Sequence, residues 1–233
     1  MISAGRPLVA FRDHLEWAIE RATDIIDIGT NQRFAKELRP LEGLFAGKRY
    51  RASGYAPERT GSPYDCDLHI DACDIALPDE SVDCVICIEV LEHLADPFRS
   101  ASELLRILRP GGRLFLTVPF LTGFYGHVDS QSGSHRDFPD YWRFTHQGLQ
   151  KLFAPLGDLR VTPLDGPIEF RVRSTPLARF VDAFPLRQVL DTIDRPRPGK
   201  ATTRHVVVGE KLALPCWANA ASKHISEPLA QDG

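Results

Sequence analysis

One continuous stretch, from Val82 to Val118, limits the folds open to this chain more than any other part of it. It begins with the nearly continuous apolar run Val82–Ile88, which is typical of a strand covered on both faces. Asp96-Pro97 then joins an N-cap to a proline suited to the first helical position, and apolar residues follow at helical spacing. Pro110-Gly111-Gly112 is expected to stop that helix before the apolar run Leu114–Val118. Strand, helix and strand in this order predict a right-handed crossover in a parallel sheet.

Short apolar runs and amphipathic stretches alternate along the rest of the chain as well. Helical periodicity predicts helices at 8–22, Gln32–Leu38, Gln147–Phe153 and Leu177–Leu190, the second of them broken at Pro40. Apolar content predicts strands at Ile25–Ile28, Tyr50–Ala52, Leu68–Ile70, Leu159–Pro163 and His205–Glu210. The length of 233 residues suits a single α/β domain over 1–214, followed by a loosely ordered tail at 215–233.

Charge and cysteine content restrict the compartment and the partners. The net charge is −3, which gives no electrostatic reason to expect a nucleic acid or an anionic membrane as partner. No apolar stretch fits a signal peptide or reaches the roughly eighteen residues of a membrane span. Cys84 and Cys87 form a CxxC motif, but inside an apolar strand this motif is typical of buried packing. We therefore expect a protein of the reducing cytoplasm.

Five short patterns follow one another between Asp71 and Phe120, and their order and spacing are specific together. They are Asp71-Ala72, Leu77–Asp83 (LPDESVD), Glu89–Pro97 (EVLEHLADP), Leu108–Gly112 (LRPGG) and Leu114–Pro119 (LFLTVP). This series resembles the class I S-adenosylmethionine-dependent methyltransferases, especially the ubiquinone-biosynthesis-like subgroup with a type 11 methyltransferase domain. The resemblance implies S-adenosylmethionine as cofactor. It also implies a doubly wound, Rossmann-like α/β sheet of seven strands, mostly parallel, with an antiparallel last strand at His205–Lys211.

A second, narrower resemblance lies at His135–Thr145 and includes the motif Asp140–Thr145, which reads DYWRFT. It is similar to a motif in methyltransferases of bacterial glycan and natural-product gene clusters. The resemblance implies a small molecule or a glycan unit as the acceptor.

The cofactor site is expected where two predicted strands end side by side. Ligands of open α/β sheets bind at the carboxyl ends of strands, where the strand order reverses. The family pattern Asp-x-Gly-x-Gly-x-Gly falls on Asp27–Arg33, where only Gly29 of the glycines is kept and Asn31 is the replacement that best tolerates positive φ. The charge of Arg33 is expected to face the carboxylate of the cofactor. The residues expected to hold the cofactor are Asp27, Gly29, Asn31, Asp71, Ala72, Glu89 and His93.

Two further positions decide how well the cofactor is held. The family usually ends its second strand with an acid that binds the ribose hydroxyls, and the corresponding position here is Gly54. Glu58 is the nearest acid that a bent loop could bring back. In the family, the residues at Asp71-Ala72 meet the edge of the adenine; the alternative is that Asp71 caps a short helix after it.

The segment Thr122–Phe144 is too long for a plain connection, so we expect it to carry the acceptor site. A hydroxyl acceptor needs a base, and histidine titrates nearest to neutral pH. His135 is the first candidate base and His127 the second, with Asp140 orienting the base or the acceptor. Side chains expected to line the acceptor site are Tyr125, Tyr141 and Arg143. The alternative is a surface loop with solvated polar residues.

Glu89, Glu92 and His93 follow the fourth predicted strand and invite comparison with a metal site. Metal sites need further converging ligands, and no second cluster has ligand spacing, so no metal is expected. Hydrogen bonds within the turn are the alternative use of Glu92 and His93.

The sequence leaves three functions to compare. The first is an O- or N-methyltransferase acting on a small molecule or a sugar unit. The second is a degenerate methyltransferase-like domain that serves as a binding or assembly partner, favoured by the altered glycine turn and by Gly54. The third, a nicotinamide-dependent oxidoreductase, needs a GxGxxG turn that this chain lacks. The sequence identifies neither the acceptor nor an oligomeric state.

Overall fold

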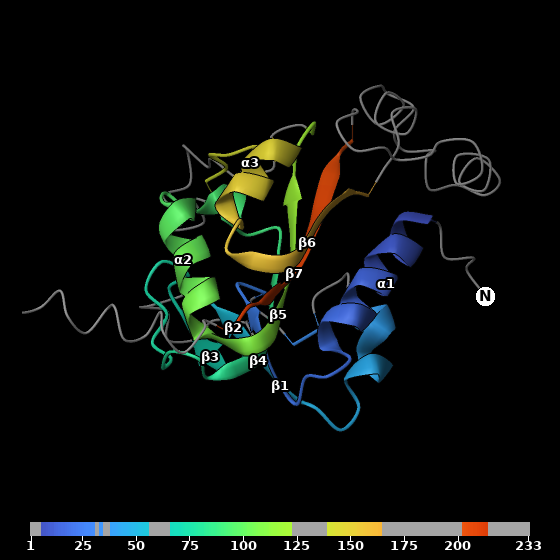
Figure 1. The fold of residues 1–233 in the computed structure, drawn as a ribbon, viewed down its shortest axis with the longest axis vertical. Helices are drawn as coiled ribbons and strands as arrows, with labels where there is room; N and C mark the ends of the chain where they lie inside the picture. Colours follow the sequence, from blue (N-terminus) through green and yellow to red (C-terminus); the bar gives the residue numbers. More distant parts are fainter. Residues whose placement is uncertain are drawn as a thin grey trace, which may run out of the picture.

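The structure, a computed structural model, describes residues 6–30, 33–34, 38–55, 66–122, 139–164 and 202–213. Within these residues the chain forms a seven-stranded sheet with the order β3-β2-β1-β4-β5-β7-β6 (Figure 1). The strands are β1 Asp24–Ile28, β2 Arg49–Gly54, β3 Leu68–His69, β4 Val82–Ile88, β5 Leu108–Pro119, β6 Leu156–Pro163 and β7 Arg204–Lys211.

Strand directions confirm the predicted fold class. β1 pairs in parallel with β2 and β4, and β2–β3 and β4–β5 are parallel as well. β7 runs antiparallel to both β5 and β6. The chain builds outward from β1 through β2 to β3, then returns to the other side of β1 with β4. The strand order therefore reverses between β1 and β4, which is the switch point of a doubly wound sheet.

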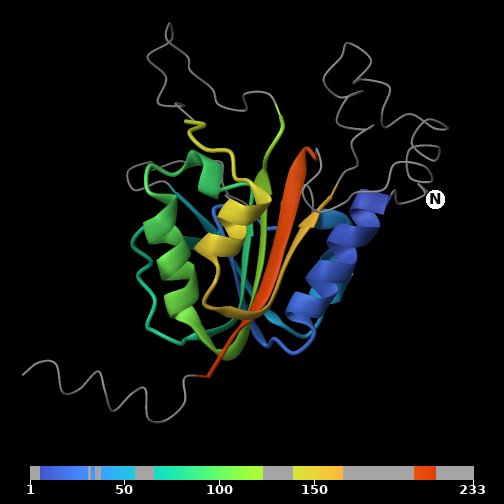
Figure 2. The same cartoon turned by 45° about the horizontal axis from the view of Figure 1, so that its top comes forward.

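Helices cover both faces of this sheet. The elements are α1 Arg6–Ile19, α2 Pro97–Ile107 and α3 His146–Leu152, with the 3-10 helices η1 Arg39–Phe45 and η2 Leu91–His93. Figure 2 shows α1 on one face of the sheet and α2 and α3 on the other. The result is a three-layer α/β arrangement.

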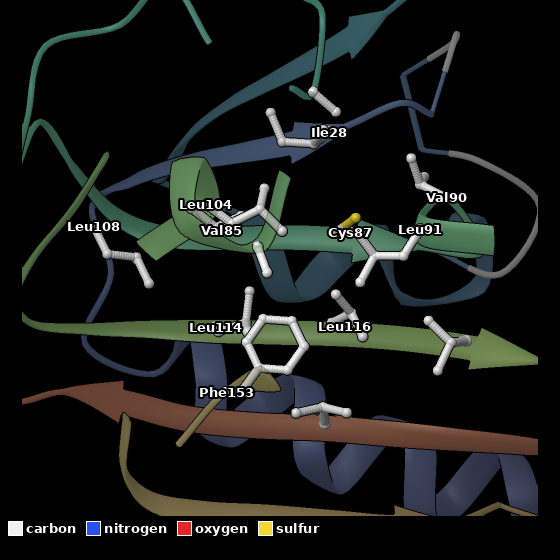
Figure 3. Close-up of a cluster of buried hydrophobic side chains, with 14 of the residues drawn as sticks. Ile28, Val85, Cys87, Val90, Leu91, Leu104, Leu108, Leu114, Leu116 and Phe153 are labelled. Atoms are coloured by element: carbon white, nitrogen blue, oxygen red, sulfur yellow. The ribbon is translucent and has the colours of Figure 1, made fainter. Parts of the chain in front are cut away.

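Side chains of β4 point alternately to the two faces of the sheet and belong to two separate hydrophobic cores. Val85 and Cys87 point into the core under α2 and α3, while Cys84 and Ile86 point into the core under α1. Figure 3 shows the first core, in which Leu104 of α2 packs over the strands. Cys84 and Cys87 thus lie on opposite faces of one strand, and burial raises the pKa of both thiols. This geometry explains why their CxxC spacing is neither a metal site nor a redox pair.

The helix between β4 and β5 begins as predicted and ends earlier than expected. The side chain of Asp96 accepts a hydrogen bond of 2.9 Å from the backbone N–H of Arg99, and Pro97 is the first helical residue. The helix ends at Ile107, and Pro110-Gly111-Gly112 lies within β5. The expectation that this tripeptide stops the helix is therefore wrong. Gly112 is required by close packing, because a Cβ there would lie 2.8 Å from the carbonyl oxygen of Arg109.

Other predicted bounds need correction or lie outside the described residues. Arg33 and Phe34 form a bend, and Pro40 lies at the start of η1, so Pro40 begins a helical turn where the sequence suggested a break. A proline suits the start of a helix because its missing N–H is not needed there. The helix expected at Leu177–Leu190 and the tail at 215–233 lie outside the described residues. None of the described helices is long and apolar enough to span a membrane.

Asp83 joins the amino ends of β1 and β4. Its Oδ2 accepts hydrogen bonds from the backbone N–H and hydroxyl of Thr23 and from the backbone N–H of Asp24, at 2.7–3.0 Å. Its Oδ1 accepts one of 2.7 Å from the guanidinium of Arg109. Burial opposes ionisation of this carboxyl, but these donors outweigh it and lower the pKa of Asp83 to about 2.

We expect Asp83→Asn to lower the free energy of unfolding by about 2 kcal/mol at pH 7, from the lowered pKa of the native carboxyl. Because the folded-state pKa lies below the unfolded one, this stabilisation is complete above about pH 4 and is lost as the pH falls towards 2. Urea unfolding at a series of pH values measures it. Asp13→Asn, at an exposed position of α1, is the control. A difference between variant and wild type that does not change from pH 7 to pH 2.5 would contradict the assignment.

Candidate functional site

The turns after β1 and β4 meet at the carboxyl edge of the sheet, as the sequence predicted. Gly29 follows β1 with φ +78°, and its backbone N–H donates a hydrogen bond of 3.2 Å to the hydroxyl of Ser53 on β2. A Cβ on Gly29 would lie 2.8 Å from a methyl group of Val90, in the turn after β4. Gly29 is therefore required both by its backbone conformation and by the close approach of the two turns.

Asp27 supports this turn from within the core. It is fully buried, and its Oδ2 accepts a hydrogen bond of 2.5 Å from the hydroxyl of Tyr50. Burial and the nearby carboxylate together raise the pKa of Tyr50, so the phenol stays protonated as the donor. The ring of Phe34 stacks on Tyr50 with centroids 4.4 Å apart. Asp27 thus fixes the packing beneath the turn, and direct contact with a cofactor stays a prediction.

The guanidinium of Arg33, beside the β1 turn, is paired with a carboxylate. Its guanidinium forms an ion pair with both carboxylate oxygens of Asp67, at 2.7 and 2.8 Å, and lies over the Tyr50 ring. Asp67 also accepts a hydrogen bond of 2.8 Å from the backbone N–H of Ala52 in β2. A carboxylate therefore lies against β2 although Gly54 ends the strand. Asp67 directly precedes β3, and β3 pairs in parallel with β2. Its place in the sequence was therefore the signal that could have predicted a carboxylate beside β2.

Asp71 and Ala72 form a turn after β3. The Asp71 carboxylate accepts a hydrogen bond of 2.8 Å from the backbone N–H of Cys73, and its carbonyl accepts one from Asp74. No helix begins there, so the alternative reading of Asp71 as a helix cap is wrong. Asp71 is exposed and Ala72 is buried. The carboxylate thus faces solvent while the turn that carries it is anchored in the core.

Glu89 connects the ends of β4 and β5. It has φ +51°, which is uncommon for a residue with a side chain. Its backbone N–H donates to the carbonyl of Thr117, and its Oε1 accepts a hydrogen bond of 2.8 Å from the Thr117 hydroxyl. Two hydrogen bonds to one residue of β5 hold this strained backbone in place.

The residues Pro139–Thr145, which we call the return segment, are bound to η2 directly after β4. The carbonyl of Glu92 accepts hydrogen bonds from the backbone N–H groups of Tyr141 and Trp142, at 2.7 and 3.2 Å. The indole N–H of Trp142 donates to the carbonyl of Leu94 at 2.8 Å. Figure 2 shows this segment, in yellow, at the edge of the sheet above α2 and α3. The DYWRF motif is thereby placed at the carboxyl end of β4.

Charged groups are concentrated where the return segment meets η2. Asp140 and Arg143 form a two-pronged ion pair, and the Asp140 side chain is almost fully buried. Arg143 is therefore paired within its own segment, while Tyr141 is 60% exposed. Burial, followed by the charge of Glu89, raises the pKa of Glu92 to about 9. Burial also lowers the pKa of His93.

A pair of histidines that the sequence analysis missed lies at the end of β5. His146 of α3 and His205 of β7 have ring centroids 6.0 Å apart, and Phe120 packs against His205. Burial, followed by the nearby His146, lowers the pKa of His205 to about 4, so this ring is neutral near pH 7. The pairing of Val118 in β5 with His205 in β7 places His205 at the end of β5, and this long-range contact cannot be inferred from the order of residues in the sequence.

Asn31, Tyr125, His127 and His135 lie outside the described residues. Among the described residues, no group of three His, Cys, Asp or Glu side chains is arranged to hold a metal ion. The structure thus forms two groups of predicted site residues. Gly29 lies against the turn after β4, and His93 lies against the return segment with Asp140, Tyr141 and Arg143.

Residues 48–116, from the start of β2 into β5, match a family described as methyltransferase domain. The match contains the turn of Asp71, the whole of β4 and η2. Over these residues the chain is similar to that family.

Known proteins with similar sequences are matched over part of their length. A probable S-adenosylmethionine-dependent methyltransferase of Mycolicibacterium smegmatis is 31% identical over 97 residues, which is 41% of this chain and 38% of the relative. A ubiquinone biosynthesis O-methyltransferase of Coxiella burnetii is 30% identical over 94 residues, 36% of this chain and 38% of the relative. The chain thus aligns with well under half of the length of these relatives.

The fold is shared with solved methyltransferase structures. A structure from Thermotoga maritima, described as a SAM-dependent methyltransferase and possible histamine N-methyltransferase, has a TM-score of 0.54. It is 17% identical and covers 88% of this chain and 89% of its own. At this identity the likeness establishes the fold alone, a Rossmann-like α/β sheet.

We expect Gly29→Ala to destabilise the domain by about 1–2 kcal/mol more than Gly47→Ala. Both glycines have positive φ, but a Cβ on Gly47 meets nothing within 4 Å, whereas one on Gly29 meets Val90. Gly47→Ala therefore carries the backbone strain without the clash. Urea unfolding of both variants, and of Gly29→Ala with Val90→Ala added, measures the difference. Equal costs for the two glycines, or no relief from Val90→Ala, would show that the two turns do not press on each other.

Proposed function

We propose that this chain is an S-adenosylmethionine-dependent methyltransferase that acts on a hydroxyl or amine of a small molecule or sugar unit. The observation that carries the proposal is the match of residues 48–116 to the methyltransferase domain, combined with the switch point that places the β1 and β4 turns together. Bound S-adenosylmethionine would supply a sulfonium methyl group, a strong electrophile whose thioether leaves readily. The residues of the chain have only to hold the reactants in line and remove a proton.

The described residues fit the cofactor in part. The exposed carboxylate of Asp71 is suited to accept from the exocyclic amine of adenine, and Gly29 has the positive φ that a tight glycine turn after β1 requires. Gly54 gives no carboxylate at the end of β2, and Asp67 is already paired with Arg33. We therefore propose weak cofactor binding. Losing one charge-assisted ribose contact costs about 1.5–3 kcal/mol, or roughly ten- to a hundredfold in affinity.

The acceptor is proposed to bind beside the return segment. The exposed ring of Tyr141 supports this placement, as does the position of the segment at the end of β4. The similarity to an O-methyltransferase supports a hydroxyl acceptor. A small or glycan acceptor, rather than a nucleic acid, also agrees with the net charge of −3. None of the four cysteines that the structure describes, at 66, 73, 84 and 87, forms a disulfide, which is compatible with the reducing cytoplasm that we propose as its location.

A degenerate domain that binds the cofactor poorly and serves as an assembly partner is the second candidate. It is favoured by the same features of the cofactor side, namely one glycine in the β1 turn and none of the usual carboxylate at Gly54. The two candidates differ in whether the cofactor binds and whether its methyl group is transferred.

Isothermal titration with S-adenosylmethionine and S-adenosylhomocysteine tests the cofactor. We expect binding by the wild type and a roughly ten- to hundredfold loss for Asp71→Asn, because a neutral amide replaces the acceptor carboxylate. Asp74→Asn, an exposed neighbour in the same turn, is the matched control and should bind as the wild type does. Absence of heat and of a thermal shift for the wild type at millimolar ligand would favour the degenerate domain.

The proposed base is His135, with His127 or Asp140 orienting the base or the acceptor. Removing a general base costs about a hundred- to ten-thousandfold in rate, so His135→Ala should lower turnover at least a hundredfold. Cofactor affinity should stay near the wild-type value. Methyl transfer from labelled S-adenosylmethionine to candidate hydroxyl acceptors measures turnover. Full turnover by His135→Ala would move the assignment to His93.

A further inference from the structure

Glu92 is a buried acid for which the described residues provide too few donors. Its side chain is only 1% exposed, and its Oε2 has no hydrogen-bond partner among the described residues. An ionised carboxylate accepts up to about four hydrogen bonds and donates none. The guanidinium of Arg143, the nearby cation, is occupied by both oxygens of Asp140. A neutral carboxylic acid therefore suits this position far better than a carboxylate.

The hydrogen bonds of His93 show where a proton on Glu92 would go. Nδ1 of His93 lies 2.5 Å from the carbonyl oxygen of Pro139, and a carbonyl can only accept, so Nδ1 carries the hydrogen. In the neutral ring, Nε2 is then an acceptor. This Nε2 lies 3.5 Å from Oε1 of Glu92. A protonated Glu92 can donate to it, whereas two acceptors or two donors facing each other here would repel.

We propose that Glu92 and His93 hold a single proton between them, and that this pair positions the return segment, with Tyr141 and Arg143, at the acceptor side of the site. The proton lies on Glu92, which donates to Nε2 of His93, while Nδ1–H of His93 donates to Pro139. The backbone carbonyl of Glu92 receives the N–H groups of Tyr141 and Trp142 at the same turn. Glu92 and His93 are thus positioning residues that act through the segment they hold.

The surroundings of Glu92 keep this proton in place near neutral pH. Besides His93, the titratable and charged groups that face it are Cys87 and Glu89 from β4 and the turn after it, and Asp140 and Arg143 from the return segment. Burial and the charges of Glu89 and Asp140 favour the neutral acid, and they outweigh the backbone N–H of Glu92 and the charge of Arg143, which favour the carboxylate. Because the folded-state pKa is raised, the contact is present at neutral pH and is lost as the pH rises through about 9. Protonation of His93 at acid pH would set two donors against each other.

Three variants of the full chain separate the proton from the shape of the side chain. Glu92→Gln keeps a neutral donor at the same place, Glu92→Leu keeps the bulk without a donor, and Glu42→Gln, at an exposed position of η1, is the control. Hydrogen exchange of the Tyr141 and Trp142 amides is the readout. We expect Glu92→Leu to speed their exchange about tenfold, and Glu92→Gln and Glu42→Gln to change it less than twofold. The wild type should lose this protection above about pH 9, after correction for the intrinsic pH dependence of exchange, and Glu92→Gln should not.

Nitrogen NMR of the His93 ring tests the proton directly in the wild type and needs no variant that might fail to fold. At pH 7 we expect a neutral ring with the hydrogen on Nδ1. A ring with its hydrogen on Nε2, or a charged ring at pH 7, overturns the proposal. So does Glu92→Gln exchanging as fast as Glu92→Leu, or Glu92→Leu exchanging as slowly as the wild type.

The consequence for the acceptor rests on the proposed methyl transfer, but the anchoring does not. With an acceptor in hand, Glu92→Leu should raise its KM at least fivefold while the affinity for S-adenosylhomocysteine stays unchanged, and Glu92→Gln should restore the wild-type KM. If the wild type binds no cofactor, the proposed function fails while the exchange and NMR results still decide the proton. If the cofactor binds and Glu92→Leu has the exchange rates of the wild type, the positioning role alone fails.

Discussion

The pairing of β1 with β4 is the interaction on which the rest of the structure depends. These strands are separated by more than fifty residues, and their contact joins the two halves of the doubly wound sheet. It brings two turns to one edge, where Gly29 leaves no room for a side chain against Val90. At the opposite edge, Asp83 joins the starts of the same two strands. The pairing of β1 with β4 therefore determines the geometry of any ligand site at the switch point.

The fold was predictable where its signals were local. The unit from Val82 to Val118 carries an apolar strand, a helix cap and a second apolar strand in sequence order, and each signal acts within a few residues. The stop expected at Pro110–Gly112 was wrong because Leu108 pairs with Val82, which draws the tripeptide into β5. A glycine pair next to a proline predicts a turn from its own preferences, whereas strand pairing is a long-range contact that overrides them.

The candidate site was predictable at the level of strand ends and not at the level of side-chain partners. Placing Gly29 and Glu89 at one edge needs only the order of the strands. The ion pair of Arg33 with Asp67 joins residues 34 positions apart, and no periodicity in the sequence predicts it. The burial of Glu92 depends on the return segment, which comes almost fifty residues later. Polar residues near a strand end therefore indicate a site, but only tertiary contacts decide which are charged.

The DYWRF motif gains a physical meaning from these contacts. Asp140 and Arg143 lie three residues apart and neutralise each other within the return segment. If Asp140 were absent, the half-buried guanidinium of Arg143 would lack its partner carboxylate, and its charge would favour the ionised form of Glu92. The ionised carboxylate has no hydrogen to donate to Nε2 of His93. The ring would then keep its hydrogen bond to the Pro139 carbonyl through Nδ1 but would lose the hydrogen bond at Nε2. The cation of the motif is thus paired with an anion of the same motif, and this pairing favours the neutral form of Glu92.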